Sequence, residues 1–401
     1  MYFTELGQKI KEEWRRKEFD SDWLPAIACE TLLAQPPSAA LDYLDVITWA
    51  ESASALPQQA RLDEAFGQPP LTVFWDDRFR IDVLFWHTAT TGIHQHQFCG
   101  AFGLLAGSSL HCRYEFNVER QLSEGLLLGS VELKNAELLK TGAAREIRAS
   151  STLIHSLFHL DSPSVSVVVR TPDDARYAPE FEYKPPNLAI DPSNSNPATT
   201  KKMQLLRLLL RLKSPDYERM AKVALENSDQ RLAFLILRQA LVHHEDPDLF
   251  DRLLKVARER HSADVDLLLP SLQEEWRRSF VITQRAQVVD PDHRFFLALL
   301  MNLPDQAAIS KIISDRHPET DPLNLVEQWC KELSGLETIG IQFDQTMDVL
   351  FGYLLRGHSD KRILELLGEQ FSPEDVGKQQ ASITELCERI RAAEILYPLF
   401  R

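Results

Sequence analysis

The chain has 401 residues, of which 44% are hydrophobic and 26% are charged, an ordinary globular composition with enough length for two or more domains. The formal net charge of −15 argues against nucleic acid and membranes as partners, although a local basic patch is compatible with it. Five scattered cysteines without a C-x-x-C pair, a charged N-terminus and no apolar run of ~20 residues predict a soluble, cytoplasmic protein with reduced thiols.

The first 65 residues are predicted to form a helical segment. "LGQKIKEEWRRKEF" places apolar residues at helical spacing among alternating charges, and "SAALDYLDVITWAESAS" carries an apolar stripe of the same period. This segment therefore precedes the first predicted strand as a separate helical arm.

Residues 66–185 show a different pattern. Runs such as "PPLTVFWDD", "RFRIDVLFWHTATTG" and "SVSVVVRTPDD" are short, rich in β-branched and aromatic residues, and separated by Gly, Asp, Ser and Pro. Strands that recur roughly every ten residues with turn signals between them are typical of an antiparallel sandwich or barrel.

The remainder of the chain is predicted to be helical. Residues 186–200 are rich in Pro, Asn and Ser and are expected to be a linker. Residues 201–401 contain apolar segments about one helix long, and several begin with Ser or Asp followed by Pro, which favours helix starts. We expect a bundle or short solenoid that caps the barrel or forms a homodimer interface. The predicted fold class is multidomain α+β, with a jelly-roll-like sandwich or barrel between N-terminal helices and a large C-terminal all-α domain.

Histidines gather in the β region. Half of the 12 histidines lie within residues 87–159, less than a fifth of the chain. His94 and His96 would project from the same face of a strand, and "LIHSLFHLD" offers His155 and His159 on a later strand. Neutral imidazole is a common ligand of transition metals, so we predict a metal site at His94 and His96 with His155, or alternatively His159, as third ligand.

Three stretches carry a family resemblance: "RFRIDVLFWHTATTGIHQH", "GAFGLLAGSSLHCRYEF" and "LIHSLFHLDSPSVSVVVRTP". They resemble the cupins, and within them the cysteine dioxygenase-like thiol dioxygenases, which have a three-histidine iron site. The resemblance covers residues 70–175, under a third of the chain. It implies a cupin barrel that binds Fe(II), with Ni, Zn or Mn as other possible metals, and that uses dioxygen and a small-molecule substrate.

Carried over by position, the resemblance makes His94, His96 and His155 the iron ligands. The carboxylate ligand of the general cupin pattern aligns with Gly100, which implies a neutral three-histidine site. Of the family's Ser-x-His-x-Tyr, only the serine is kept, at Ser166, and the arginine that binds the carboxylate of cysteine is missing. Cysteine itself is therefore not the expected substrate, unless Arg78, Arg80 or Arg170 binds its carboxylate through two hydrogen bonds.

Further residues are expected around the metal. The candidate catalytic or supporting residues are His159, Ser166, Arg170 and Cys99, and the candidate substrate-binding residues are Arg78, Arg80 and Tyr114. Arg170 is the preferred partner for a substrate carboxylate, because strand alternation places it on the same face as Ser166. His87 and His111 are expected to be structural.

Two functions follow from these observations. The first is a mononuclear non-haem iron(II), O2-dependent oxygenase or oxidase acting on a small molecule such as a thiol. The second is a non-catalytic cupin that binds a metal or ligand and is fused to a helical protein-interaction scaffold.

Overall fold

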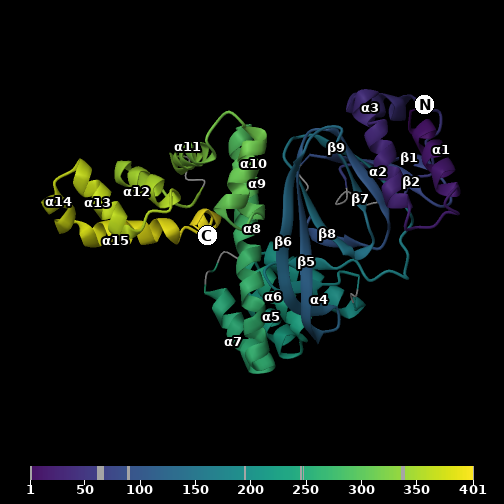
Figure 1. Cartoon of the computed structure of the whole chain (residues 1–401). Helices are drawn as coiled ribbons and strands as arrows, with labels where there is room; N and C mark the ends of the chain where they lie inside the picture. The colour runs from purple at the N-terminus through teal and green to yellow at the C-terminus, as the bar shows by residue number, and fades with distance from the viewer. Residues whose placement is uncertain are drawn as a thin grey trace. The chain divides into compact units, whose positions relative to one another are not determined.

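The computed structural model describes residues 2–60, 67–87, 91–193, 196–243, 246, 248–335 and 339–400. Contacts divide the chain into two compact units, residues 1–276 and 277–401. The predicted fold class is confirmed, because along the chain the β-strands follow N-terminal helices and precede a long helical region (Figure 1).

The β region consists of two antiparallel sheets. The open sheet has five strands in the order β1 (Pro70–Trp75), β2 (Arg80–Trp86), β9 (Ser164–Arg170), β4 (Gly100–Ala106) and β7 (Ala144–Ile147). The second sheet closes as a barrel in the order β10 (Glu182–Lys184), β11 (Leu188–Ile190), β6 (Leu126–Leu139), β5 (Ser109–Ser123), β8 (Ser150–His159) and β3 (Ile93–His96).

Alternation along the open sheet separates two cores. In β9, Val165, Val167 and Val169 belong to a cluster shared with the N-terminal helices, whereas Val168 belongs to a second cluster with Trp86, Phe102 and Leu157. Because successive side chains of a strand point to opposite faces, Ser166 and Arg170 share the face of Val168. This second cluster, together with the polar side chains on its face, is called the inner core below.

The N-terminal helices cover the other face of the open sheet. They are α1 (Tyr2–Arg15), α2 (Leu24–Ala34), the short η1 (Pro37–Ala39) and α3 (Tyr43–Ser52). The helix α1 approaches so closely that a Cβ on Gly7 would lie 2.7 Å from the ring of Phe74. The apolar residues of α1 are thus buried against β1 and β2, as the sequence predicts, and α2 packs on β4. In α3 only Val46 is buried, whereas Leu44 and Ile47 are 56% and 40% exposed, so the apolar stripe predicted there is not buried as a whole.

Helices after the sheets complete the first unit. They are α4 (Pro197–Arg211), α5 (Tyr217–Glu226), α6 (Gln230–His243), α7 (Leu249–His261), η2 (Ser262–Leu268) and the beginning of α8 (Leu269–Gln287). They share one core with strand residues Leu126, Leu128, Leu188 and Ile190. Part of the segment predicted as a linker forms strand β11 and the start of α4. The predicted domain boundaries stay a prediction.

The second unit is helical. Its helices after α8 are α9 (Pro291–Asn302), α10 (Gln306–Arg316), α11 (Pro322–Gly335), α12 (Gln345–Leu355), α13 (Asp360–Gln370), α14 (Pro373–Lys378), α15 (Gln380–Arg391) and η3 (Tyr397–Phe400). Asp290, Asp305 and Asp344 cap three of these helices through their side chains, and Asp290 is followed by Pro291, which is the start signal predicted from the sequence. Among the described residues, no helix combines the length and hydropathy that a membrane span requires.

Candidate metal centre

Two neighbouring strands bring three histidines together. His94 and His96 lie on β3, and His155 lies on β8, where it is the direct cross-strand partner of His94. One ring nitrogen from each of the three lies within 4.8 Å of the others. The predicted set of His94, His96 and His155 therefore converges and could hold a metal ion.

The spacing of two ring nitrogens fits a shared cation. Nε2 of His96 lies 2.9 Å from Nε2 of His155. Two imidazole ligands at right angles on a metal, each about 2.1 Å from it, would place their nitrogens about 3.0 Å apart. Two lone pairs facing each other at this distance repel, so a proton or a metal ion between them stabilises the arrangement.

Burial keeps these histidines neutral. His96 and His155 are each 4% exposed, and His94 is half-buried. Burial, followed by the neighbouring histidines, lowers the pKa of His96 and His155 well below the ordinary value of 6.5, and burial also lowers the pKa of His94. Neutral rings carry the lone pair that a metal requires.

The ring of His94 is oriented by its own loop. Nδ1 of His94 lies 2.8 Å from the carbonyl oxygen of Gly92, which can only accept a hydrogen bond. The proton of neutral His94 therefore resides on Nδ1, and Nε2 keeps its lone pair for a ligand bond.

The ring of His155 has a partner that the sequence did not reveal. Nδ1 of His155 lies 3.1 Å from Nε2 of His111 on β5, and Nδ1 of His111 lies 2.9 Å from Oε1 of Glu137 on β6. His111 is 1% exposed. The expectation that His111 is merely structural is therefore incomplete, because this ring contacts a candidate ligand.

His159 and Ser166 lie in the inner core around Trp86. The indole Nε1 of Trp86 donates to Oγ of Ser166 at 2.9 Å, and the ring of His159 stacks on Trp86 with centroids 4.4 Å apart. Oγ of Ser109 lies 3.1 Å from Nδ1 of His159. The structure thus groups His155, and not His159, with the pair on β3.

Arg80 and Arg170 face the inner core from paired positions of β2 and β9. The guanidinium of Arg170 lies 3.5 Å from the ring centroid of Phe98, and the Phe98 ring is tilted against that of His96 with centroids 4.4 Å apart. Arg170 also donates to the exposed carboxylate of Asp173. Burial, followed by Arg80, lowers the pKa of Arg170 to about 10, so it remains a cation at pH 7.

Three other candidates are not brought to the histidines. The Cys99 thiol lies in the core beneath the N-terminal helices, 3.4 Å from the carbonyl oxygen of Ser21. The Arg78 guanidinium lies over the ring of Phe19, 4.2 Å from its centroid. Tyr114 pairs with Ile154, the chain neighbour of His155, and therefore projects from the opposite face of β8 and β5.

Sequence reasoning missed His111, Glu137 and Arg113 as neighbours of the site. Arg113 is the exposed cross-strand partner of His155, and His111 pairs with Glu137. The alternation in "LHCRYEF" places His111 and Arg113 on one face. The alternation predicts that His111 and Arg113 share a face of their strand. Only the register of β5 with β8 shows that His155 projects from the same face of the sheet.

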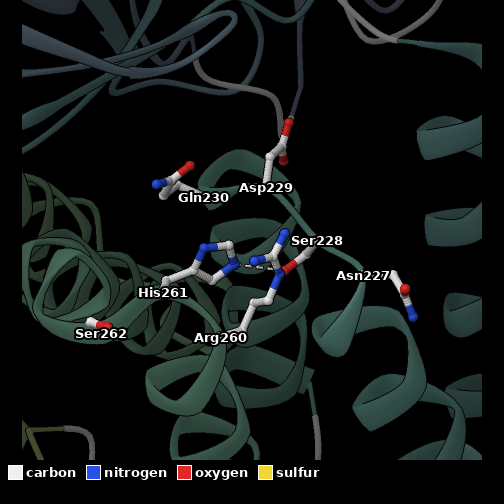
Figure 2. A pocket seen from close by; sticks show the side chains of 7 residues that line it. All are labelled: Asn227, Ser228, Asp229, Gln230, Arg260, His261 and Ser262. Carbon is white, nitrogen blue, oxygen red and sulfur yellow. Dashed lines mark hydrogen bonds between the residues drawn. The ribbon is translucent and has the colours of Figure 1, made fainter.

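The helices of the first unit line a pocket to which none of these histidines contributes (Figure 2). It has a volume of about 480 Å³ and is lined by residues 227–230 and 260–262. Its buried Ser228 donates to the carbonyl oxygen of Leu225 at 2.8 Å, and its Oγ lies 2.9 Å from Nε2 of His261. The hydroxyl proton is already committed to a carbonyl, so this pair lacks the arrangement of an activated nucleophile.

Comparisons with known proteins identify no family. No model of a protein family matches the chain, and no curated protein matches it. A chain from the crystal structures of the DMSP lyases RdDddP and RnDddQII is 15% identical, with a TM-score of 0.23 over 38% of this chain and 75% of that chain. The capsular polysaccharide assembling protein CapF from Staphylococcus aureus is 13% identical, with a TM-score of 0.22 over 41% of this chain and 44% of that chain.

These structural likenesses are too low to support a conclusion about activity. The barrel with three converging histidines is itself compatible with the cupin resemblance in the sequence. The closer resemblance to cysteine dioxygenases stays a prediction.

Proposed function

We propose that this protein is a mononuclear non-haem iron(II) oxygenase that oxidises a small thiol with dioxygen. The observation that carries the proposal is the convergence of three neutral imidazoles, with Nε2 of His96 and His155 2.9 Å apart. The net reaction would be R–SH + O2 → R–SO2H, in which sulfur loses four electrons and dioxygen gains them.

The residues of the chain would hold and shield the metal. His94, His96 and His155 supply neutral nitrogen ligands, and no carboxylate among the described residues joins this group, which leaves the full charge of the metal for an anionic substrate. An iron(II) ion with three protein ligands supplies open positions for substrate and dioxygen. The apolar rings of Phe98 and Phe102 exclude water on one side of the histidines.

Arg170 is the candidate that would select an anionic substrate. It is buried, it remains a cation, and it packs on the Phe98 ring that also contacts His96. A guanidinium in such a place binds a carboxylate through two parallel hydrogen bonds. Asp173 is 63% exposed and could give up Arg170 to a substrate carboxylate at little cost.

The proposal is tested by metal content and oxygen uptake. Protein purified without oxygen should retain about one iron per chain, and His94→Ala should lose it while the helices remain folded by circular dichroism. Iron-loaded protein should consume dioxygen with at least one member of a panel of small thiols. Unchanged iron content in His94→Ala would contradict the ligand assignment.

The same experiment separates the enzyme from the non-catalytic alternative. Protein that binds iron but consumes no dioxygen with any thiol or amino acid would favour a metal-binding cupin on a helical scaffold. Arg170→Lys keeps the charge but loses the planar fork, so it should raise KM for a carboxylate-bearing thiol far more than for one without a carboxylate.

A further inference from the structure

A series of hydrogen bonds runs from His155 over neighbouring strands to Arg145. His155 on β8 contacts His111 on β5, and His111 contacts Glu137 on β6, at 3.1 Å and 2.9 Å. Arg145 on β7 donates to both carboxylate oxygens of Glu137, through Nε at 2.9 Å and through Nη2 at 2.5 Å. A third hydrogen bond, from Nη1 to the carbonyl oxygen of Ala144 at 2.7 Å, fixes the guanidinium.

The direction of each hydrogen bond follows from its chemistry. Nε2 of His155 faces His96 and is the atom that would bind the metal. Neutral His155 must then carry its proton on Nδ1, and this N–H needs an acceptor. Nε2 of His111 is that acceptor only if His111 carries its own proton on Nδ1, where the carboxylate of Glu137 accepts it.

We propose that His111 is a positioning residue, held by Glu137 and Arg145, that fixes the proton of His155 on Nδ1 and so presents Nε2 as the metal-binding atom. The inference deepens the proposed function, because it concerns the affinity of the same site. The hydrogen bonds that begin at His155 pass through the imidazole of His111 and end at the carboxylate of Glu137. His94, in contrast, is oriented by a single backbone carbonyl. Partners that orient a ligating imidazole typically change metal affinity 10- to 100-fold when they are removed.

The carboxylate of Glu137, where this series of hydrogen bonds ends, is balanced by the charge of Arg145. Burial raises the pKa of Glu137, but hydrogen bonds from His111 and Arg145 outweigh it and lower the pKa to about 2. Glu137 is therefore an anion at pH 7 whose charge is balanced by Arg145, 39% exposed. A fixed acceptor of this kind costs little and polarises both imidazoles toward the metal.

The test compares two substitutions of His111 in the full-length protein. His111→Phe keeps a planar ring but removes the acceptor, whereas His111→Gln keeps an amide oxygen that can accept from His155. Glu137→Gln keeps an acceptor for His111 but removes the charge. Glu146→Gln is the matched control, because Glu146 lies on the same strand as Arg145 and pairs with Arg148 at the surface.

Two measurements are made on each variant. Cobalt(II) titration gives the Kd for the metal, and 15N NMR of histidine-labelled, metal-free protein shows which nitrogen of His155 carries the proton.

We expect His111→Phe to weaken cobalt(II) binding 10- to 100-fold, His111→Gln to recover most of the loss, and Glu146→Gln to match the wild type. Glu137→Gln should lie between wild type and His111→Phe, and it tests the same chain if His111→Phe does not fold. Equal affinity in His111→Phe and wild type, an equal loss in His111→Phe and His111→Gln, or a proton on Nε2 of His155 in wild-type protein would each overturn the inference.

Failure of the proposed function would look different. If wild-type protein bound no cobalt(II), the metal site itself would be refuted. The NMR spectrum of the metal-free protein would still decide whether His111 sets the proton of His155, since that measurement requires no metal.

Discussion

His96 and His155 become ligands because the barrel removes them from water. Burial disfavours their charged forms, so they remain neutral at pH values where an exposed histidine is partly protonated. Loss of a proton before metal binding would otherwise lower the affinity. The same burial makes the unfolded chain the better proton acceptor.

The stability of the metal-free protein should therefore fall below pH 6.5. His94, His96, His111 and His155 all have lowered pKa values, so below 6.5 the unfolded chain binds more protons than the folded one. Each such histidine contributes a slope of up to about 1.4 kcal/mol per pH unit, from 6.5 down to its folded pKa. Urea unfolding at pH 7.5, 6.5 and 5.5, followed by tryptophan fluorescence, measures the slope. His155→Gln should reduce it, and a free energy of unfolding that does not change between pH 6.5 and 5.5 would contradict the account.

Gly100 explains why the site lacks a carboxylate at the position that aligns with the cupin ligand. A Cβ on Gly100 would lie 1.9 Å from the carbonyl oxygen of Val169 on β9. Gly100→Ala should therefore destabilise the protein by about 1–3 kcal/mol or more, because β4 and β9 must separate. Gly92→Ala, near His94 and with open space around it, is the control and should change the free energy of unfolding little. Equal stability of the two variants would refute the close approach.

The pattern of residues in the sequence predicts the strands, but it does not predict every contact between side chains of different strands. His94 and His96 could be found because two residues of one strand share a face, and His155 because the surrounding sequence resembles a known strand. The contact of His111 with His155 depends on the register of β5 against β8, which local sequence does not encode. The sequence predicts Cys99 and Arg78 near the metal, whereas the structure places them beside the N-terminal helices. Alternation along a strand does not show which face of the open sheet those helices cover.

The N-terminal helices should stabilise the open sheet, each through the side chains of one face. Leu32 on α2 is 1% exposed and belongs to the core beneath the open sheet, whereas its neighbour Leu33 is 50% exposed. Leu32→Ala should cost about 2–5 kcal/mol, and Leu33→Ala less than about 0.5 kcal/mol. Denaturant unfolding of the two variants measures the difference. Similar losses in both would show that α2 does not pack as described.

At the scale of the molecule, helices after the barrel share its core. Phe234 on α6 is fully buried in the cluster that includes Leu126 and Ile190 of the strands, whereas Phe351 on α12 is buried in the second unit. Phe234→Ala should cost about 3–5 kcal/mol and lower the temperature at which the metal is released. Phe351→Ala should leave the Kd for metal unchanged. A weaker Kd in Phe351→Ala would show that the metal site depends on residues 277–401.

One measurement tests the central claim most directly: the anomalous difference map of a crystal grown with iron(II) in the absence of oxygen, recorded on both sides of the iron absorption edge. We predict a single strong peak about 2.0–2.2 Å from one ring nitrogen each of His94, His96 and His155. A map without a peak among these three rings, in crystals whose solution contains saturating iron, would contradict the account.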